Sequence, residues 1–184
     1  MADDNGALYL KDAILQLRAY KKMGEKAIAQ VYDSGLTKVL YSDANSIAIL
    51  VKHMSGNMRS RWTMFLTTDG EKPDRDRDSE FELSEEPTRE ELITWWDDGW
   101  ARVFDAIEHL KPEDLGRTVT IRGQPHSVLQ AINRQLMHYA YHIGQIVQVA
   151  RIHTGERWNT LTIPRGGSEQ FNKANWGQAG KSHS

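Results

Sequence analysis

Two histidines with metal-ligand spacing, His138 and His142, lie in the stretch 127–153, which reads as one long helix. Positions i and i+4 share a helical face, so both imidazoles can reach one point in space. Two neutral nitrogens in this arrangement suit a first-row divalent metal ion. Such pairs also arise by chance in helices, so the spacing needs the support of a third ligand.

A third histidine, His53, lies in an apolar-periodic run that predicts a helix over residues 44–67. Three histidines from two helices, with other positions left to water or substrate, form the ligand set of an open catalytic metal site. Because the chain has no cysteine, His, Asp or Glu must hold any metal. Zinc, nickel, iron and manganese all tolerate such a site. A hydroxyl of Tyr139 or Tyr141 can hold the second nitrogen of a ligand imidazole.

Histidines that simply face solvent are the competing interpretation. The apolar stripe of the 127–153 helix is centred roughly 100° away from His138 and His142, so both flank the core. A solvated face of this protein would be expected to carry Lys and Glu. The neighbours on the histidine face carry no charge: Ala131, Gln135, Gln145 and Val149. This favours a lined pocket at the edge of a helical bundle.

Four amphipathic helices are predicted to position these histidines. They cover residues 6–34 with Gly35 as the stop, residues 44–67, residues 88–110 with a capping box at Thr88 and Glu91, and residues 127–153 ending at Gly155. Residues 118–121 predict a short strand. Residues 69–87 are strongly charged and read as a surface loop long enough to span a helix. The sequence therefore predicts an all-α four-helix bundle with a long crossover loop.

The composition favours a single domain over residues 1–184. We expect a tail from about residue 155 to 184 that packs on the bundle up to about Trp176, covers the metal cleft, and then becomes disordered. The formal net charge is −2 with both signs interspersed, which gives no surface for nucleic acid and no basic membrane patch. Neither a signal peptide nor a membrane span is recognisable, so the expected location is the cytoplasm.

The segments HMSGNMRSRW (53–62) and HYAYHIGQI (138–146) resemble the paired signatures of the DinB-like superfamily. These are four-helix-bundle proteins whose characterised enzymes are bacillithiol S-transferases and related thiol transferases. The segment 157–172 resembles an uncharacterised branch of this superfamily. The resemblance implies an up-down-down-up bundle, often a homodimer. It also implies that His53, His138 and His142 bind one divalent ion, usually nickel or zinc, with iron or manganese as further candidates.

Transfer of a low-molecular-weight thiol to an electrophile is the first functional hypothesis. A divalent metal lowers the pKa of a bound thiol, and here the thiol must come from a cosubstrate because cysteine is absent. Asn57, Arg61 and Gln145 are the candidate substrate-binding residues, with Arg59 as a further cation for the carboxylates of the thiol. A surface salt bridge is the competing interpretation of Arg61.

Two other hypotheses remain open. One is hydrolysis by metal-bound water, which usually needs a carboxylate base. No carboxylate is adjacent in sequence to the histidines, although Asp97 and Asp98 could supply one. The other is a non-catalytic, stress-associated dimeric bundle, in which the helix that carries Trp95, Trp96 and Trp100 forms the dimer face. The sequence assigns no catalytic acid or base.

Overall fold

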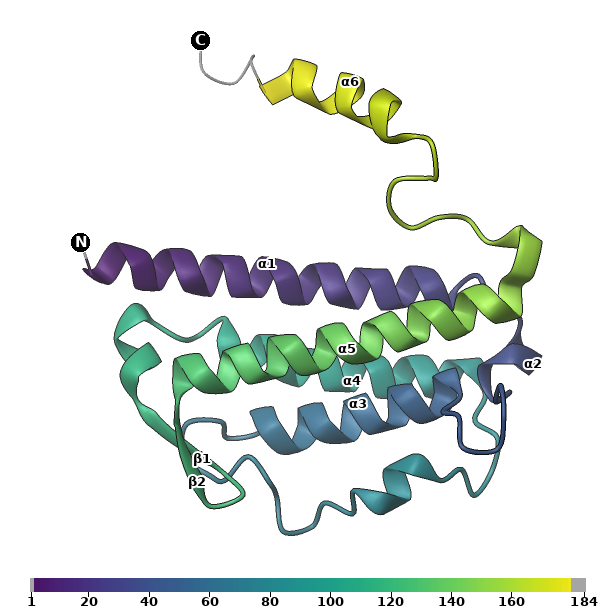
Figure 1. Cartoon of the computed structure of the whole chain (residues 1–184). Coiled ribbons are helices and arrows are strands. Elements are labelled where there is room, and N and C mark those ends of the chain that lie inside the picture. Colours follow the sequence, from purple (N-terminus) through teal and green to yellow (C-terminus); the bar gives the residue numbers. More distant parts are fainter. Residues whose placement is uncertain (1, 180–184) are drawn as a thin grey trace.

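A four-helix bundle makes up most of the computed structural model, which describes residues 2–179. The bundle helices are α1 (Ala2–Ile28), α3 (Ile47–Trp62), α4 (Arg89–Ile107) and α5 (Val128–Thr154). In Figure 1, α1 and α5 run in one direction and α3 and α4 in the other. The predicted all-α bundle of up-down-down-up topology is therefore confirmed. Within residues 2–179, no helix has the length and apolar character needed to cross a membrane.

Side chains at the helix ends explain where three of the bundle helices begin and end. Ser46 caps α3 by accepting a hydrogen bond from the backbone N–H of Ile49. Capping boxes open α4 at Thr88 and α5 at Ser127. Gly155 follows α5 with a φ of 60°, a conformation that favours glycine. The predicted starts of the last two bundle helices thus rest on local hydrogen bonds.

Two predicted boundaries are wrong. The helix expected over residues 44–67 ends at Trp62, because Thr63 is extended and Met64 has a φ of 50°. The first helix ends at Ile28 and not at Gly35, which lies inside a separate short helix, α2 (Asp33–Leu36). Both differences lie where the chain turns into a connection, and there the apolar pattern carries little information.

The bundle core is aromatic where α4 meets its neighbours. Trp96 and Trp100 of α4 are fully buried, and the Trp100 ring lies 5.5 Å from that of Tyr139 on α5. Glycine allows this close packing, since a Cβ at Gly24 of α1 would lie 2.5 Å from the Trp96 ring. Only Trp95 of the three tryptophans is left partly exposed. This burial excludes Trp96 and Trp100 from a dimer face.

A long crossover connection, residues 63–88, leads from the end of α3 to the start of α4 and contains the 3-10 turn η1 (Asp78–Phe81). It follows α3 along the outside of the bundle (Figure 1). Lys52 holds η1 by donating to the carbonyl oxygens of Ser79 and Glu82 at 2.8 and 2.7 Å. The predicted surface loop is therefore tied to the helix that carries His53.

A small hairpin supports the first part of this connection, just after α3. After the turn η2 (Pro112–Gly116), β1 (Thr118–Ile121) pairs antiparallel with β2 (Gln124–Ser127). Sequence reasoning found only β1, because Pro125 disfavours a strand at the second position. The Asp69 carboxylate accepts from the backbone N–H groups of Glu71, Arg122 and Gly123 at 2.7 to 2.8 Å. It thereby joins the crossover connection to the hairpin turn.

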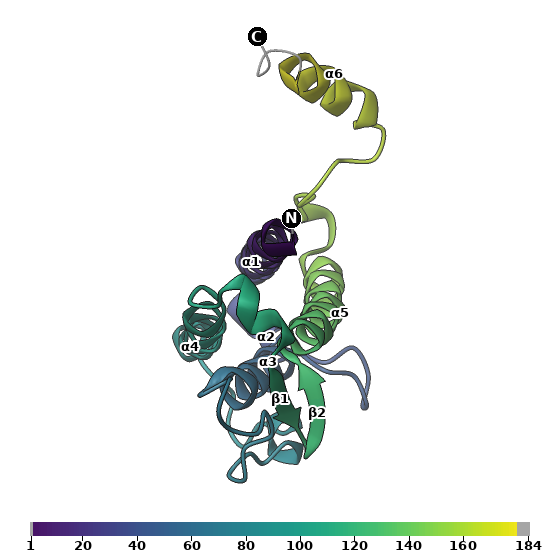
Figure 2. The ribbon, with the colours of Figure 1, turned by 90° about the vertical axis from the view of Figure 1, so that its left-hand side faces the viewer.

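Only the first part of the tail packs on the bundle, whereas packing up to about Trp176 was expected. Trp158 and Leu161 pack against the core beyond the turn η3 (Gly155–Arg157), and the N–H of Asn159 donates to Gln30 at 2.7 Å. The helix α6 (Ser168–Ala179) then lies apart from the bundle (Figures 1 and 2). Its apolar side chain Phe171 is 47% exposed, so this residue does not dock α6 on the bundle. The disordered end expected after Trp176 falls largely on residues 180–184, which lie outside the described part.

We predict that Gly24→Ala destabilises the protein although alanine favours helix. The new methyl group would overlap the buried Trp96 ring, and overpacking of this kind costs about 1–3 kcal/mol. Urea unfolding followed by circular dichroism measures the change. The matched control is Gly144→Ala in α5, where a Cβ meets no atom within 4 Å. A Gly24 variant as stable as wild type would contradict the packing described here.

We also predict that Asp69 stabilises the fold above about pH 4. Backbone N–H groups, first that of Glu71 and then that of Gly123, lower the pKa of Asp69 from 3.8 to about 2. A folded-state pKa below the unfolded value gives stability that is lost as the pH falls towards 2. Asp69→Asn should cost about 1 kcal/mol at pH 7 and close to nothing at pH 2. Asp78→Asn, at an exposed position of the same connection, should show no such pH-dependent difference in urea unfolding.

Candidate metal centre

Three histidines meet between α3 and α5. His53 of α3 and His138 and His142 of α5 have ring centroids 4.6 to 5.5 Å apart. One nitrogen of each ring lies within 4.8 Å of the other two. His53 and His142 are only 3% and 6% exposed. Small side-chain rotations would bring these nitrogens onto one ion, so this group could hold a metal.

Hydrogen bonds orient two of the three rings. His53 Nδ1 donates to Glu80 Oε2 at 2.9 Å, and His142 Nδ1 donates to Gln145 Oε1 at 2.7 Å. Each bond leaves the Nε2 lone pair free for a ligand. The Nε2 atom of His138 is buried and has no hydrogen-bond partner among residues 2–179. Metal-binding histidines have this arrangement, in which the second ring nitrogen donates to a carboxylate or an amide oxygen.

The protonation state also suits a metal. Burial lowers the pKa of His138 to about 3, and the neighbouring His142 and His53 add to the effect. Burial, with smaller contributions from His53 and Arg77, lowers the pKa of His142 to about 4. Both rings are therefore neutral near pH 7, the form that binds metal. An unpartnered buried nitrogen and three imidazole donors fit a first-row divalent ion.

Glu80 is the carboxylate beside the histidines. It comes from η1, is buried, and accepts from Arg75 on both oxygens at 2.8 Å as well as from His53. Although burial alone would raise it, the pKa of Glu80 is lowered by the hydrogen bonds from His53 and Arg75. Sequence reasoning missed this residue because it lies 27 positions after His53, among many other carboxylates.

Gly56 makes room for that carboxylate. A Cβ at Gly56 would lie 2.2 Å from Glu80 Oε1, so no other residue type fits on this face of α3 while Glu80 keeps its position. A glycine inside a helix, three residues after a candidate ligand, is the one sequence signal that something approaches α3 closely here.

The three proposed substrate-binding residues have other partners. Asn57 is buried and accepts from the Tyr139 hydroxyl at 3.3 Å. Arg61 is also buried, where it donates to Glu71 at 2.8 Å and to the carbonyl of Gly70. Gln145 accepts from the ligand candidate His142. Asn57 and Arg61 therefore hold the fold together, and Gln145 positions a histidine.

Other expected contacts also differ. Tyr139 is fully buried and accepts from Trp62 Nε1 at 2.8 Å, while Tyr141 accepts from the Gln145 amide at 3.2 Å. Neither hydroxyl bonds directly to a ligand histidine. Asp97 pairs with Lys21 at 2.8 Å and Asp98 with Arg102 at 3.2 Å, so neither is a base for the centre.

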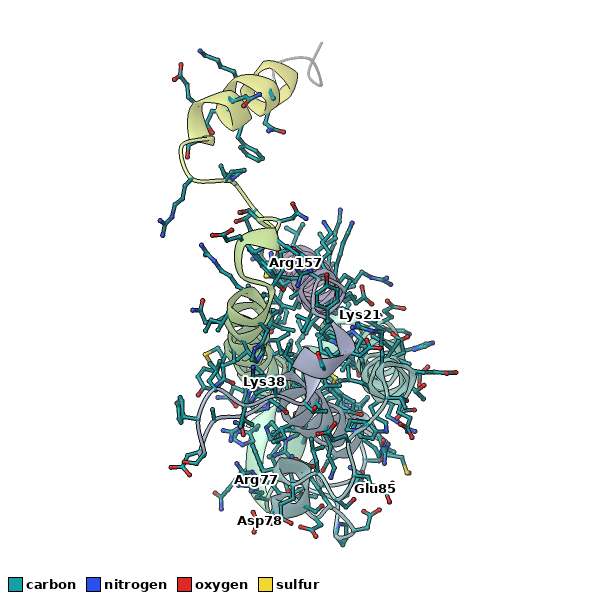
Figure 3. The ribbon with its side chains drawn as sticks, turned by 90° about the vertical axis from the view of Figure 1, so that its right-hand side faces the viewer. Lys21, Lys38, Arg77, Asp78, Glu85 and Arg157 are labelled. Carbon is teal, nitrogen blue, oxygen red and sulfur yellow. The ribbon has the colours of Figure 1, made fainter. Side chains whose placement is uncertain are left out.

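The crossover connection, and not the tail, covers the histidines. The Phe81 ring lies 4.6 Å from the His53 ring, and the Arg77 guanidinium lies 5.0 Å over the Phe81 ring. Figure 3 shows Arg157, at the start of the tail, on the opposite side of the bundle from Arg77 and Asp78. The prediction of a lid formed by the tail is therefore wrong. The tail leaves the bundle beside α1, where Arg157 lies over the Tyr32 ring.

Comparison with known proteins gives one match. Residues 4–167 match the model of a family described as "Protein of unknown function (DUF1572)". No curated protein and no solved structure matches the chain. The family description names no activity, so any functional assignment must come from the site itself.

We predict that Glu80→Gln weakens metal binding about 10- to 100-fold, the usual effect of removing a carboxylate that orients a ligand histidine. The measurement is competition for zinc with a chromogenic chelator. Glu82→Gln, at an exposed position two residues further along, is the matched control. An unchanged zinc affinity in Glu80→Gln would show that the His53–Glu80 bond does not matter for the metal.

Gly56→Ala should have the same effect through displacement of Glu80 by the new methyl group. Alanine favours helix by up to about 1 kcal/mol over glycine, so the substitution should not unfold α3. A loss of zinc affinity in a folded variant would then report displacement of Glu80 and not unfolding. The same chelator assay applies, again with Gly144→Ala as the control for a helical glycine that has free space around it. Full affinity in Gly56→Ala would contradict the need for close approach.

Proposed function

The chain belongs to the family described as "Protein of unknown function (DUF1572)", and we propose that it is a metal-dependent enzyme that transfers a low-molecular-weight thiol to an electrophile. The observation that carries this proposal is the group of three histidines: His138 and His142 are neutral near pH 7, and His138 Nε2 has no hydrogen-bond partner within residues 2–179. The resemblance of residues 53–62 and 138–146 to the DinB-like superfamily supports the same reading.

Zinc or nickel is the ion that we propose. The group consists of imidazole nitrogens without a carboxylate ligand, which suits borderline ions better than magnesium or calcium. When bound, such an ion lowers the pKa of a coordinated thiol so that the reactive thiolate exists near pH 7. The protein itself supplies the three imidazole rings, of which Glu80 orients His53 and Gln145 orients His142.

Arg77 is the arginine that we propose for binding a carboxylate of the thiol, a role that the sequence analysis gave to Arg61. Its guanidinium is half exposed, lies over Phe81, and pairs at 3.8 Å with Asp78, which is 98% exposed. A pair of this length in solvent contributes little, so the Arg77 charge is available to a ligand. Arg77 would hold a carboxylate of the thiol cosubstrate, while the electrophile enters beside Phe81.

The same arrangement disfavours hydrolysis and a purely structural role. Activation of water calls for a protein base, yet both oxygens of Glu80 accept from Arg75 and its pKa is lowered. A histidine that only packs in the core is normally hydrogen-bonded, whereas His138 Nε2 is not. Thiol transfer needs no such base, since the metal acidifies the thiol directly.

The proposal is tested by thiol-dependent consumption of monobromobimane by the zinc- or nickel-loaded protein. We expect turnover with cysteine as the thiol, and no turnover above the metal-free background for His142→Ala. Arg77→Ala should raise KM about tenfold for cysteine, which carries a carboxylate, but leave KM for 2-mercaptoethanol unchanged. A metal-loaded protein that consumes no electrophile with any of a panel of biological thiols would contradict thiol transfer.

A further inference from the structure

A cavity of about 550 Å³ lies between α3, α4 and the crossover connection. Glu80 forms part of its wall, but the histidine group does not line it. It faces the side of α3 that carries Lys52, Gly56 and Arg59, whereas His53 belongs to the neighbouring face. Its volume falls in the range of small-molecule sites, and none of the functions considered above uses it.

Positively charged side chains outnumber negatively charged ones in the lining of this cavity. Lys52 and Lys72 both line it, and both ammonium groups donate to neutral carbonyl oxygens, Lys52 to Ser79 and Glu82 and Lys72 to Ser60 and Asp69. In the described part of the chain, neither lysine pairs with a carboxylate within 4 Å. Their charges hold the backbone of the connection in place and remain uncompensated by an ion pair.

A pair of guanidinium groups lines the α4 side. Arg59 Nη2 lies 3.5 Å and Arg102 Nε 3.2 Å from Asp98 Oδ2, so two guanidinium groups share one carboxylate. The Arg59 side chain is 61% exposed and its bond to Asp98 is at the limit of hydrogen-bond length. Arg59 can therefore turn to a ligand at little cost. Arg102 donates to both oxygens of Asp98 at 3.2 Å through Nε and Nη2, while its Nη1 donates to Thr63 of the cavity wall at 3.4 Å. A ligand carboxylate in the cavity would therefore receive charge-assisted hydrogen bonds from Arg59 and from Nη1 of Arg102.

Trp95 gives the same wall an apolar surface. It lies on α4 seven residues before Arg102, on the same helical face, and is the tryptophan of α4 that the core leaves partly exposed. The acidic side chains that line the cavity do not neutralise its lysine and arginine side chains. Asp74 and Asp76 are exposed, and Glu80 is taken by Arg75 and His53.

We propose that this cavity is a binding site for a small aromatic carboxylate, with the carboxylate held by Arg59 and by Nη1 of Arg102, and the ring against Trp95. Flat rings stack on indole, and guanidinium groups match carboxylates in geometry. The site is separate from the histidine group, so the proposal does not depend on thiol transfer or on metal binding.

The test is isothermal titration of the full-length protein with 2-naphthoate. We expect saturable binding that weakens as salt is raised, at least tenfold weaker binding of the uncharged 2-naphthamide, and no binding of acetate. Arg59→Gln/Arg102→Gln should weaken 2-naphthoate binding at least tenfold. Arg59→Gln alone, at an exposed and weakly paired position, should weaken it severalfold without affecting the fold.

Two matched variants locate the binding. Arg18→Gln removes an exposed arginine of α1 that pairs with Glu108, and should leave the affinity unchanged. His142→Ala should also leave it unchanged, because the carboxylate is not expected at the histidines. Absence of 2-naphthoate binding, equal affinity in Arg59→Gln/Arg102→Gln, or loss of binding in His142→Ala would each overturn the proposal.

Discussion

A hydrogen bond between two buried side chains, His53 Nδ1 and Glu80 Oε2, connects the crossover loop to the centre of the bundle. A buried carboxylate is costly unless it is paired and hydrogen-bonded on every side. Glu80 meets this condition through His53 and the bidentate Arg75. The requirement then decides much of the surrounding structure, because Gly56 must lack a Cβ and η1 must stay where Lys52 holds it.

The charged sequence of the crossover connection follows from the same constraint. Glu71 accepts from Arg61 at 2.8 Å and from Arg75 and Arg122 at 3.2 Å, so one network joins α3, the connection and the hairpin. Ion pairs that are partly buried contribute modest net stability, but an unpaired member is strongly unfavourable. The network therefore selects one path for a long segment that has few apolar residues of its own.

Much of the fold was predictable because it rests on local patterns. Apolar periodicity located four helices, the capping box at Thr88 began α4, and the i, i+4 spacing placed His138 and His142 on one face. The meeting of His53 with that pair followed from the ligand set that a metal requires. These features depend on residues close in sequence or on a small number of side chains of one chemical type.

Other features depended on contacts that sequence spacing does not reveal. Glu80 looked like any other carboxylate of a solvated loop. Arg61 was a candidate for substrate binding or for a surface salt bridge, whereas it is buried and donates to Glu71 and Gly70. The tail contains aromatic residues that suggested packing, but Phe171 of α6 is 47% exposed and α6 lies apart from the bundle (Figure 1). In each case the partner lies in another element, and the chain carries only an indirect sign of it, such as Gly56 within α3.

Metal content tests most directly the central claim that the three histidines bind a metal ion. Untagged wild-type protein and the His138→Ala/His142→Ala double variant would be reconstituted with zinc or nickel, desalted, and analysed by plasma mass spectrometry. The account predicts about one equivalent of metal in the wild type and its loss in the double variant, as expected for a site with three histidine ligands. No metal in either protein after reconstitution, or equal metal in both, would contradict it.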